Sequence, residues 1–130
     1  MVKILHPEDE PLITECLKEF YKEISNAQVD FVENGEQAYD KFRKTNYDIL
    51  VTDFHMPGLN GGDLIKKIRQ SDNKIPIFTF NANADKENTE FDKAGLRKEI
   101  IASYEKPDFL GFIQGLKDYI TRQETETNSK

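Results

Sequence analysis

The stretch Tyr47-Asp48-Ile49-Leu50-Val51-Thr52-Asp53 decides the fold class of this chain. Its centre is a row of three branched apolar residues, as expected of a strand in a parallel sheet that helices cover on both faces. Its last residue is an aspartate, and the loop that follows, residues 54–62, holds three glycines and one proline. Ligands of such sheets bind at the carboxyl ends of the strands, so this aspartate is the first candidate for chemistry.

The rest of the chain alternates between short apolar runs and segments in which apolar residues have helical spacing. We expect four further strands, at residues 2–5, 29–32, 75–80 and 100–104. We expect helices at residues 11–24, 34–42, 64–68, 84–94 and 108–120. The segment 84–94 is the weakest of these, because only Ala84, Phe91 and Ala94 could line an apolar face. Strands and helices that alternate in this way predict an α/β fold with a parallel sheet and right-handed crossovers.

The length and composition fit a single globular domain. The 130 residues include 37% hydrophobic and 32% charged residues, and the mean hydropathy is −0.70. No apolar run approaches the ~18 residues that span a bilayer, so we expect no membrane insertion. The net charge of −6 argues against direct binding of nucleic acid, which needs a basic face.

The chain has one cysteine, Cys16, so an intramolecular disulfide is impossible. Its spacing from Ile13 and Phe20 predicts a small buried core residue, and a free thiol favours a cytoplasmic location. The end of the chain, from Gln123 onward, has no apolar residue. We therefore expect a domain at residues 1–121 and a disordered tail at residues 122–130.

Polar residues follow four of the five expected strands at their carboxyl ends. Glu8 and Asp9 follow the first strand, Asp53 the third, Asn81 the fourth and Lys106 the fifth. Because parallel strands end along one edge of the sheet, these side chains should meet there. An acidic first turn of a helix could by itself explain the first two residues. Three carboxylates and a lysine at one edge are harder to explain as packing.

These residue types suit phosphoryl transfer assisted by a divalent cation. Three ionised carboxylates would repel one another, and Mg²⁺, which binds oxygen ligands and keeps several waters, would remove that repulsion. An aspartate carboxylate can act as a nucleophile and form an aspartyl-phosphate. Lys106 would stabilise charge on the transferred group from the side away from the metal. Neither His6 nor His55 has a partner at zinc-type spacing, so we do not expect either imidazole to bind metal.

The motifs around these residues resemble the receiver domain of bacterial response regulators in two-component signalling. They are Ile4-Leu5-His6-Pro7-Glu8-Asp9-Glu10-Pro11, residues 47–57, Asn60-Gly61 and Glu105-Lys106-Pro107. The resemblance covers about residues 2–120, and the motifs are specific in combination although each is weak alone. It implies a flavodoxin-like receiver fold, with a five-stranded parallel sheet of strand order 2-1-3-4-5 flanked by five helices.

The resemblance also implies a role for each candidate residue. Asp53 would be the phosphoacceptor, with Glu8, Asp9 and the backbone carbonyl of His55 holding Mg²⁺ beside it. Lys106 would pair with the phosphoryl oxygens. The phosphoryl donor would be a histidine kinase or a histidine phosphotransfer protein. The domain would be a phosphorelay signalling module that assists its own phosphorylation and dephosphorylation, not a classical enzyme.

Two positions depart from the family pattern. Asn81 stands where receivers carry Ser or Thr, and Ser103 stands where an aromatic residue is usual. Thr79 lies two residues too early to supply the hydroxyl, and Tyr104 should fall on the other face of its strand. In the family these positions couple phosphorylation to the surface of the fourth helix, fifth strand and last helix, so we expect that surface to shift little. Pro7, late in a central strand, is a further oddity because it cannot donate to the ladder.

Three functions remain open from the sequence. The first is a phosphorylation-controlled module, a monomer or weak dimer, that acts through an unidentified downstream partner because the sequence predicts no output domain. The second is a receiver-like adaptor that binds its partner in either phosphorylation state, which Asn81 and Ser103 favour. The third is a small Mg²⁺-dependent phosphatase for free substrates, for which the sequence offers no substrate pocket. The retained carboxylates and Lys106 favour the first.

Overall fold

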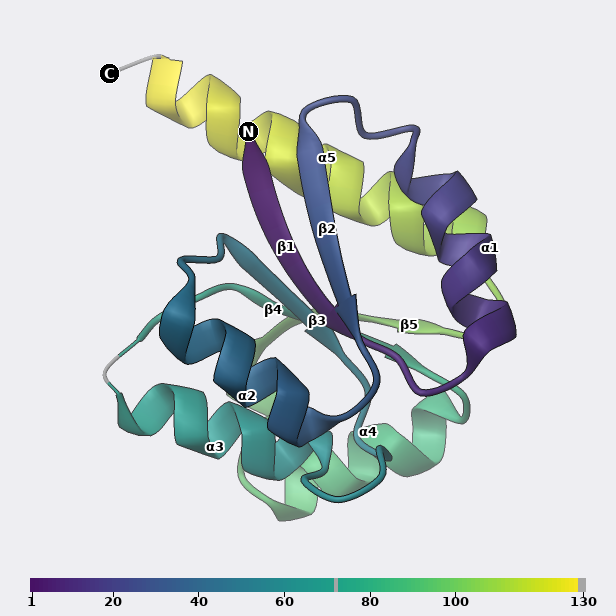
Figure 1. Cartoon of the computed structure of the whole chain (residues 1–130), viewed down its shortest axis with the longest axis vertical. Helices are drawn as coiled ribbons and strands as arrows, with labels where there is room; N and C mark the ends of the chain where they lie inside the picture. The colour runs from purple at the N-terminus through teal and green to yellow at the C-terminus, as the bar shows by residue number, and fades with distance from the viewer. Residues whose placement is uncertain (72, 129–130) are drawn as a thin grey trace.

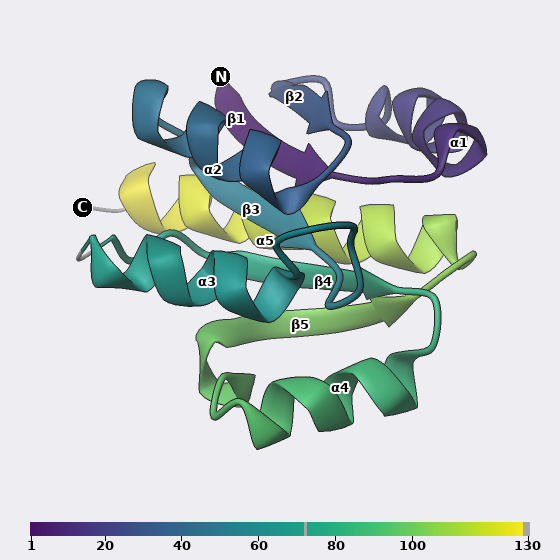
Figure 2. The same cartoon turned by 60° about the horizontal axis from the view of Figure 1, so that its bottom comes forward.

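Five parallel strands form one sheet at the centre of the computed structural model, which describes residues 1–71 and 73–128 (Figures 1 and 2). The strands are β1 (Val2–Pro7), β2 (Ala27–Val32), β3 (Ile49–Thr52), β4 (Ile77–Asn81) and β5 (Ile100–Glu105). Their order is β2-β1-β3-β4-β5, and every neighbouring pair is parallel. This arrangement confirms the expected fold class and the strand order that the resemblance implied.

Helices cover both faces of the sheet (Figure 1). They are α1 (Pro11–Tyr21), α2 (Gly35–Lys44), α3 (Gly61–Gln70), α4 (Ala84–Lys93) and α5 (Phe109–Asn128), with a 3₁₀ turn, η1 (Arg97–Glu99), before β5. The side chains of α1 and α5 pack into one core cluster, and those of α2, α3 and α4 pack into the other. The sheet therefore has a buried layer on each side.

Local sequence signals explain where the helices begin. Asn34, Asn60 and Asn83 each precede a helix, and the side-chain oxygen of each accepts a hydrogen bond from the backbone N–H three residues later. Such caps satisfy N–H groups that have no partner within the helix. α1 begins instead with Pro11 in its first turn, where a missing N–H costs nothing. Gly95, with φ of +74°, follows the end of α4 in the left-handed conformation that suits glycine.

The central residues of β3 are buried from both sides. Leu50 belongs to the cluster under α2, α3 and α4, whereas Ile49 and Val51 belong to the cluster under α1 and α5. Each is at most 2% exposed. Burying one such side chain stabilises a fold by about 1.5–3 kcal/mol, so packing on both faces fixes the strand that leads into Asp53.

The structure corrects the expectation of a disordered tail. α5 continues to Asn128, so residues 122–128 are helical, and residues 129–130 lie outside the described part of the chain. Extending an existing helix adds one hydrogen bond per residue without a new nucleation step, and this does not require apolar side chains. The side chain of Asn26 also donates a hydrogen bond to Glu124. The domain boundary at residue 121 stays a prediction.

The expectation that Cys16 is buried was wrong, because its side chain is exposed on α1. The buried stripe of this segment consists of Leu17, Tyr21 and Ile24, which follow one another at helical spacing. Cys16 lies one position away from that stripe, and a step of one residue turns the side chain by about 100° around the helix axis. The spacing from Ile13 and Phe20 was misleading, since both lie at the partly buried margin.

Pro7 lies at the end of β1, where its missing N–H has no ladder partner to lose. The N–H groups along a strand point alternately to its two neighbours, and the N–H of Glu8 donates to the carbonyl of Val32, the last residue of β2 (2.8 Å). The nitrogen of Pro7 therefore faces β3, and the pairing of β1 with β3 ends at Leu5. Proline is tolerated at such a position in a sheet.

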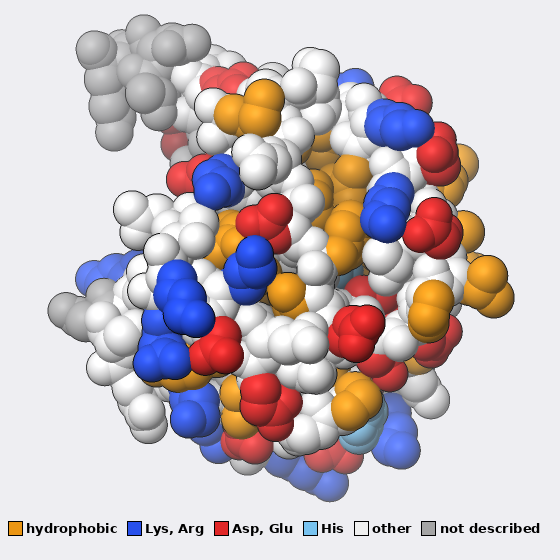
Figure 3. Space-filling model, in the orientation of Figure 1, with side chains coloured by type: hydrophobic (Ala, Val, Ile, Leu, Met, Phe, Trp, Pro, Cys, Tyr) orange, Lys and Arg blue, Asp and Glu red, His pale blue; other side chains and the backbone are white. Residues whose placement is uncertain are grey.

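Charged side chains of both signs are spread over the face shown in Figure 3, and no basic stripe crosses it. Apolar side chains line a hollow between β2 and α1, among them Tyr21, Ile24, Val29 and Phe31. In residues 1–71 and 73–128, no helix has the length and apolar character needed to cross a membrane.

We expect α4 to be the least protected helix in hydrogen exchange. Phe91 is its only fully buried apolar side chain, and its other buried residue is the acidic Glu87. Helices in proteins are held mainly by apolar packing, so a helix with one buried anchor should open locally at low cost. Amide exchange read by NMR on the whole chain tests this. Protection of α4 equal to that of α5, which buries Phe112 and Leu116, would contradict it.

Candidate functional site

Lys106 lies between two carboxylates at the carboxyl edge of the sheet. Its Nζ is 2.7 Å from Oε1 of Glu8 and 3.1 Å from Oδ2 of Asp53. The three side chains come from the ends of β1, β3 and β5, and none of them is more than 8% exposed. The predicted edge therefore brings Glu8, Asp53 and Lys106 together. The Lys106–Pro107 peptide is cis.

Burial and ion pairing act in opposite directions on these three groups. Burial raises the pKa of Asp53 to about 7, although the attraction of Lys106 opposes the rise. Burial likewise raises the pKa of Glu8. For Lys106, burial disfavours the charged form, but the attraction of Asp53 and Glu8 outweighs it and raises the pKa of the ammonium. The site thus keeps a cation next to two carboxyls that release their protons reluctantly.

Two buried oxygens at this edge have no hydrogen-bond partner within the described residues: Oδ1 of Asp53 and Oδ1 of Asn81. Asn81 ends β4, and its carbonyl accepts a hydrogen bond from the backbone N–H of Lys106 (2.7 Å), so it lies beside the ion pair. Buried polar atoms are nearly always paired in folded proteins. Unpaired oxygens next to a cation and two carboxyls therefore mark a place for a ligand.

The predicted metal ligands are only partly brought together. Glu8 and Asp53 meet at Lys106, whereas Asp9 is exposed and lines a hollow of about 260 Å³ beside α1 together with Glu8. Among residues 1–71 and 73–128, no three His, Cys, Asp or Glu side chains are grouped so that they could hold a metal ion. The donor chemistry still fits Mg²⁺, because the side chains of Glu8, Asp9 and Asp53 offer carboxylate oxygens.

Glu87 is a buried acidic residue at this site that the sequence analysis missed. It lies on α4 and is 2% exposed. Its Oε1 accepts a hydrogen bond from the backbone N–H of His55 (3.2 Å), and its Oε2 accepts one from Asn83 (3.1 Å). It ties the first turn of α4 to the loop after Asp53. A carboxylate in the first turn of a helix is a recognisable signal, but it does not reveal that the side chain turns inward.

The two atypical positions lie on the face of the sheet that α4 covers. Ser103 of β5 is paired in register with Thr79 of β4, and their hydroxyls are 2.7 Å apart. Tyr104 packs on the opposite face, where its ring meets Phe112 of α5 at a centroid distance of 5.8 Å. This confirms that Tyr104 does not replace the missing aromatic residue.

The two histidines have different surroundings. His6 is buried in an aromatic cluster, and its Nδ1 is 2.8 Å from the hydroxyl of Tyr21. Burial lowers the pKa of His6 to about 3, so the imidazole is neutral. His55 is exposed in the loop after Asp53, and its backbone contacts Glu87.

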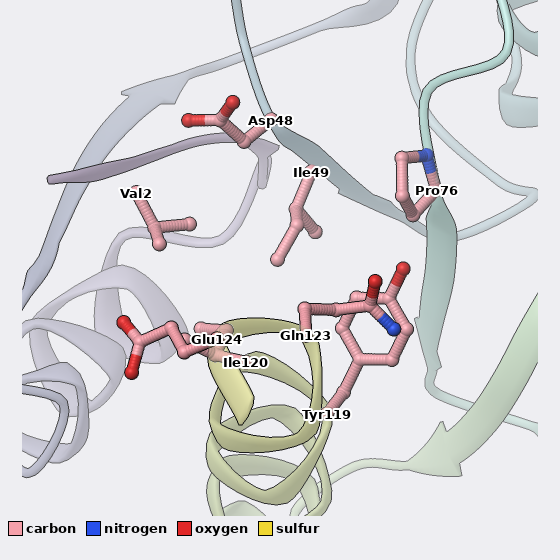
Figure 4. Close-up of a pocket in the computed structure, with 8 residues that line it drawn as sticks. All are labelled: Val2, Asp48, Ile49, Pro76, Tyr119, Ile120, Gln123 and Glu124. Atoms are coloured by element: carbon pink, nitrogen blue, oxygen red, sulfur yellow. The ribbon is translucent and has the colours of Figure 1, made fainter. Parts of the chain in front are cut away.

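A larger hollow lies at the opposite edge of the sheet, at the amino ends of the strands (Figure 4). It measures about 540 Å³ and is lined by Val2, Asp48, Ile49, Pro76, Tyr119, Ile120, Gln123 and Glu124. None of the predicted site residues lines this hollow, so it is separate from the Asp53 site.

Solved structures of low sequence identity have the same fold. The receiver domain of the Francisella response regulator 1452 has a TM-score of 0.78 at 25% identity and covers 95% of this chain and 99% of that one. The response regulator TrrA of Thermotoga maritima, solved in complex with Mg²⁺ and BeF, has a TM-score of 0.75 at 29% identity and covers 91% and 98%.

Curated bacterial proteins are similar to this chain in sequence. The regulatory protein VanRB of Enterococcus faecalis is 32% identical over 67% of this chain, and the match covers 39% of its own length. The chemotaxis protein CheY-3 of Vibrio cholerae is 27% identical over 79% of this chain and 82% of its own. The chain spans only about two fifths of VanRB, and 35% of the Bacillus subtilis regulator ResD.

The family model described as the response regulator receiver domain matches residues 4–103, which is most of the chain. That match includes Glu8, Asp9, Asp53 and Asn81 and stops just before Lys106. Together with the strand order, it identifies this chain as a member of the response regulator receiver domain family, a family of two-component signal transduction.

Proposed function

We propose that this receiver domain accepts a phosphoryl group on Asp53 from a histidine kinase or a histidine phosphotransfer protein, in a reaction that needs Mg²⁺. The observation that carries the proposal is the contact of Asp53 with Lys106, in which Oδ2 is paired with the ammonium and the buried Oδ1 has no hydrogen-bond partner among residues 1–71 and 73–128. This leaves one oxygen to attack while the other is held by a cation.

The side chains at the site supply most of the chemistry. Oδ1 of Asp53 would form a bond to phosphorus as the bond from phosphorus to the donor imidazole nitrogen breaks, and that nitrogen would keep the electron pair. The Lys106 ammonium is already buried beside Asp53, so it could move from the carboxylates to the negative phosphoryl oxygens and stabilise their charge. Mg²⁺, held by Asp53, Glu8, Asp9 and the His55 carbonyl, would neutralise further charge on the phosphoryl group.

Asp53 must be ionised to act as the nucleophile. With a pKa of about 7 it is only partly ionised at neutral pH in the protein alone. Cations beside the carboxyl favour the ionised form. We infer that phosphorylation of this chain is faster above pH 7 than below it when divalent cation is limiting.

Replacing Asp53 with asparagine should abolish phosphorylation, because the amide is not a nucleophile for this reaction. Intact mass measured after treatment with acetyl phosphate and Mg²⁺ tests this. The matched control is Asp48→Asn, a second aspartate at the other end of β3, whose exposed carboxylate accepts a hydrogen bond from the N–H of Lys3. We expect the wild type and Asp48→Asn to gain one phosphoryl group. A stable Mg²⁺-dependent gain in Asp53→Asn would refute the assignment.

A second candidate is an adaptor that binds its partner in either phosphorylation state, and Asn81 and Ser103 favour it. It predicts partner binding that is unchanged in Asp53→Asn. A phosphatase for free substrates is less favoured, because the larger hollow, of about 540 Å³, lies at the edge of the sheet away from Asp53. A cytoplasmic location, a monomer or weak dimer, and a downstream protein partner remain proposals.

A further inference from the structure

Four side chains form a continuous line of hydrogen bonds from the Asp53 site to α4. The amide Nδ2 of Asn81 donates to Oγ1 of Thr79 (3.3 Å), and Thr79 donates to Oγ of Ser103 (2.7 Å). Ser103 donates to Oδ1 of Asn88 on α4 (3.2 Å). Asn81 and Thr79 are fully buried, and Ser103 and Asn88 are partly buried. The line crosses from β4 to β5 and ends at a helix.

This line has a direction. A hydroxyl has one proton to donate, so Thr79 and Ser103 each accept from one neighbour and donate to the other. Nδ2 of Asn81 donates to Thr79, and the acceptor Oδ1 of Asn81 has no hydrogen-bond partner within the part of the chain that the structure describes. The donors therefore all point from Asn81 toward Asn88.

A phosphoryl group on Asp53 is incompatible with this orientation of the Asn81 amide. Its oxygens are acceptors, so an amide at position 81 can bind them only through Nδ2. When the amide of Asn81 turns to place Nδ2 toward the phosphoryl group, Oδ1 faces Thr79 instead. Thr79 must then donate to Asn81 and accept from Ser103, and Ser103 must accept from Nδ2 of Asn88.

We propose that phosphorylation reverses this hydrogen-bond line, and that Thr79 and Ser103 act as positioning residues that pass the orientation of the Asn81 amide to Asn88. The inference rests on the proposed function of Asp53. Every hydrogen bond is kept and every donor becomes an acceptor, so the backbone need not move. The Asn88 amide turns over, and the atom that it directs away from Ser103 changes from a donor to an acceptor.

This mechanism accounts for the two atypical residues together. Ser103 is small and carries a hydroxyl, which completes the line where an aromatic ring could not. Asn81 carries both a donor and an acceptor on one side chain, which a reversible end of the line requires. A partner that contacts α4 would detect the exchange as a hydrogen bond gained or lost at Asn88.

The side-chain amide signals of Asn88 test the proposal. Spectra of the ¹⁵N-labelled full chain would be recorded with and without beryllofluoride and Mg²⁺, with Asn88→Asp used for assignment. We expect the Asn88 signals to shift in the wild type and to stay unchanged in Thr79→Val, which keeps the shape but removes the hydroxyl. Ser103→Ala, at a partly buried position, cuts the line a second time if Thr79→Val does not fold. Thr89→Val is the control, because that exposed hydroxyl donates to the Asp85 carbonyl within α4 and does not belong to the line.

The outcomes separate this proposal from the proposed function. If the backbone amide signals of Asp53 and Lys106 shift and the side-chain amide signals of Asn88 do not, the proposed reversal is wrong and the phosphorylation of Asp53 stands. A shift of Asn88 that persists in both Thr79→Val and Ser103→Ala would also overturn it, because the signal would then travel by another route. If the wild-type spectrum does not change with beryllofluoride and Mg²⁺, and intact mass shows no added phosphate, then both the phosphorylation of Asp53 and the reversal are wrong.

Discussion

Replacing Lys106 with methionine is expected to lower the free energy of unfolding by about 3–5 kcal/mol at pH 8 in metal-free buffer. The ammonium is the only cation that contacts Glu8 and Asp53 within the described residues. Methionine fills a similar volume without the charge, so both carboxylates would remain buried without compensation. The loss should be much smaller at pH 5, where carboxyls whose folded pKa is raised take up protons and become neutral.

Urea unfolding at pH 5 and pH 8 with a chelator present measures this effect. Lys66→Met is the matched control, because Lys66 is an exposed residue of α3. That variant should change stability by less than about 0.5 kcal/mol at either pH. Equal losses at both pH values for Lys106→Met would mean that the lysine contributes packing and not charge compensation.

Replacing Asp53 with asparagine is expected to stabilise the metal-free protein at pH 8 and to have little effect at pH 4. Burial raises the pKa of Asp53 from 3.8 to about 7. A group with a raised folded pKa contributes stability that is fully present below the unfolded pKa and is lost as the pH rises through the folded pKa. The wild type should therefore lose stability between about pH 4 and pH 7. The asparagine variant has no carboxyl at position 53, so it should not show this part of the loss.

The expected difference at pH 8 is on the order of 2–4 kcal/mol, since each unit of pKa corresponds to about 1.4 kcal/mol and the variant also loses one partner of Lys106. Thermal or urea unfolding from pH 4 to pH 8 measures it, with Asp48→Asn as the control at an exposed carboxylate. If the stability of the wild type and of Asp53→Asn changes with pH in the same way, ionisation of Asp53 does not destabilise the fold and the prediction is wrong. Added Mg²⁺ should stabilise the wild type more than the variant, because one oxygen donor is lost.

The sheet and the position of the site followed from the sequence for identifiable reasons. The apolar run of residues 49–51 indicated a strand covered on both faces, and the rule for parallel sheets placed Glu8, Asp53 and Lys106 at one edge. That rule states which strand ends meet, and it does not state which side chains bond. The contact of Lys106 with both carboxylates and the exposed position of Asp9 therefore appeared only in three dimensions.

Other features escaped the sequence analysis because apolar periodicity does not report polar contacts. α4 looked weak when only apolar residues were counted, but Glu87 and Asn88 connect it to the site by hydrogen bonds. Thr79 was set aside because it lies two residues before the expected position, and from that earlier position its hydroxyl reaches Ser103. The end of α5 was expected to be disordered because it lacks apolar residues, which helix continuation does not need.

The exposed thiol of Cys16 makes the protein convenient for chemical labelling. As the only cysteine, it offers a single position for a maleimide dye or a spin label, without any cysteine having to be removed first. α1 packs on the face of the sheet opposite α4, so a probe there would leave α4 accessible. The same thiol would join two copies through a disulfide in air, and purified samples need a reducing agent before their oligomeric state is measured.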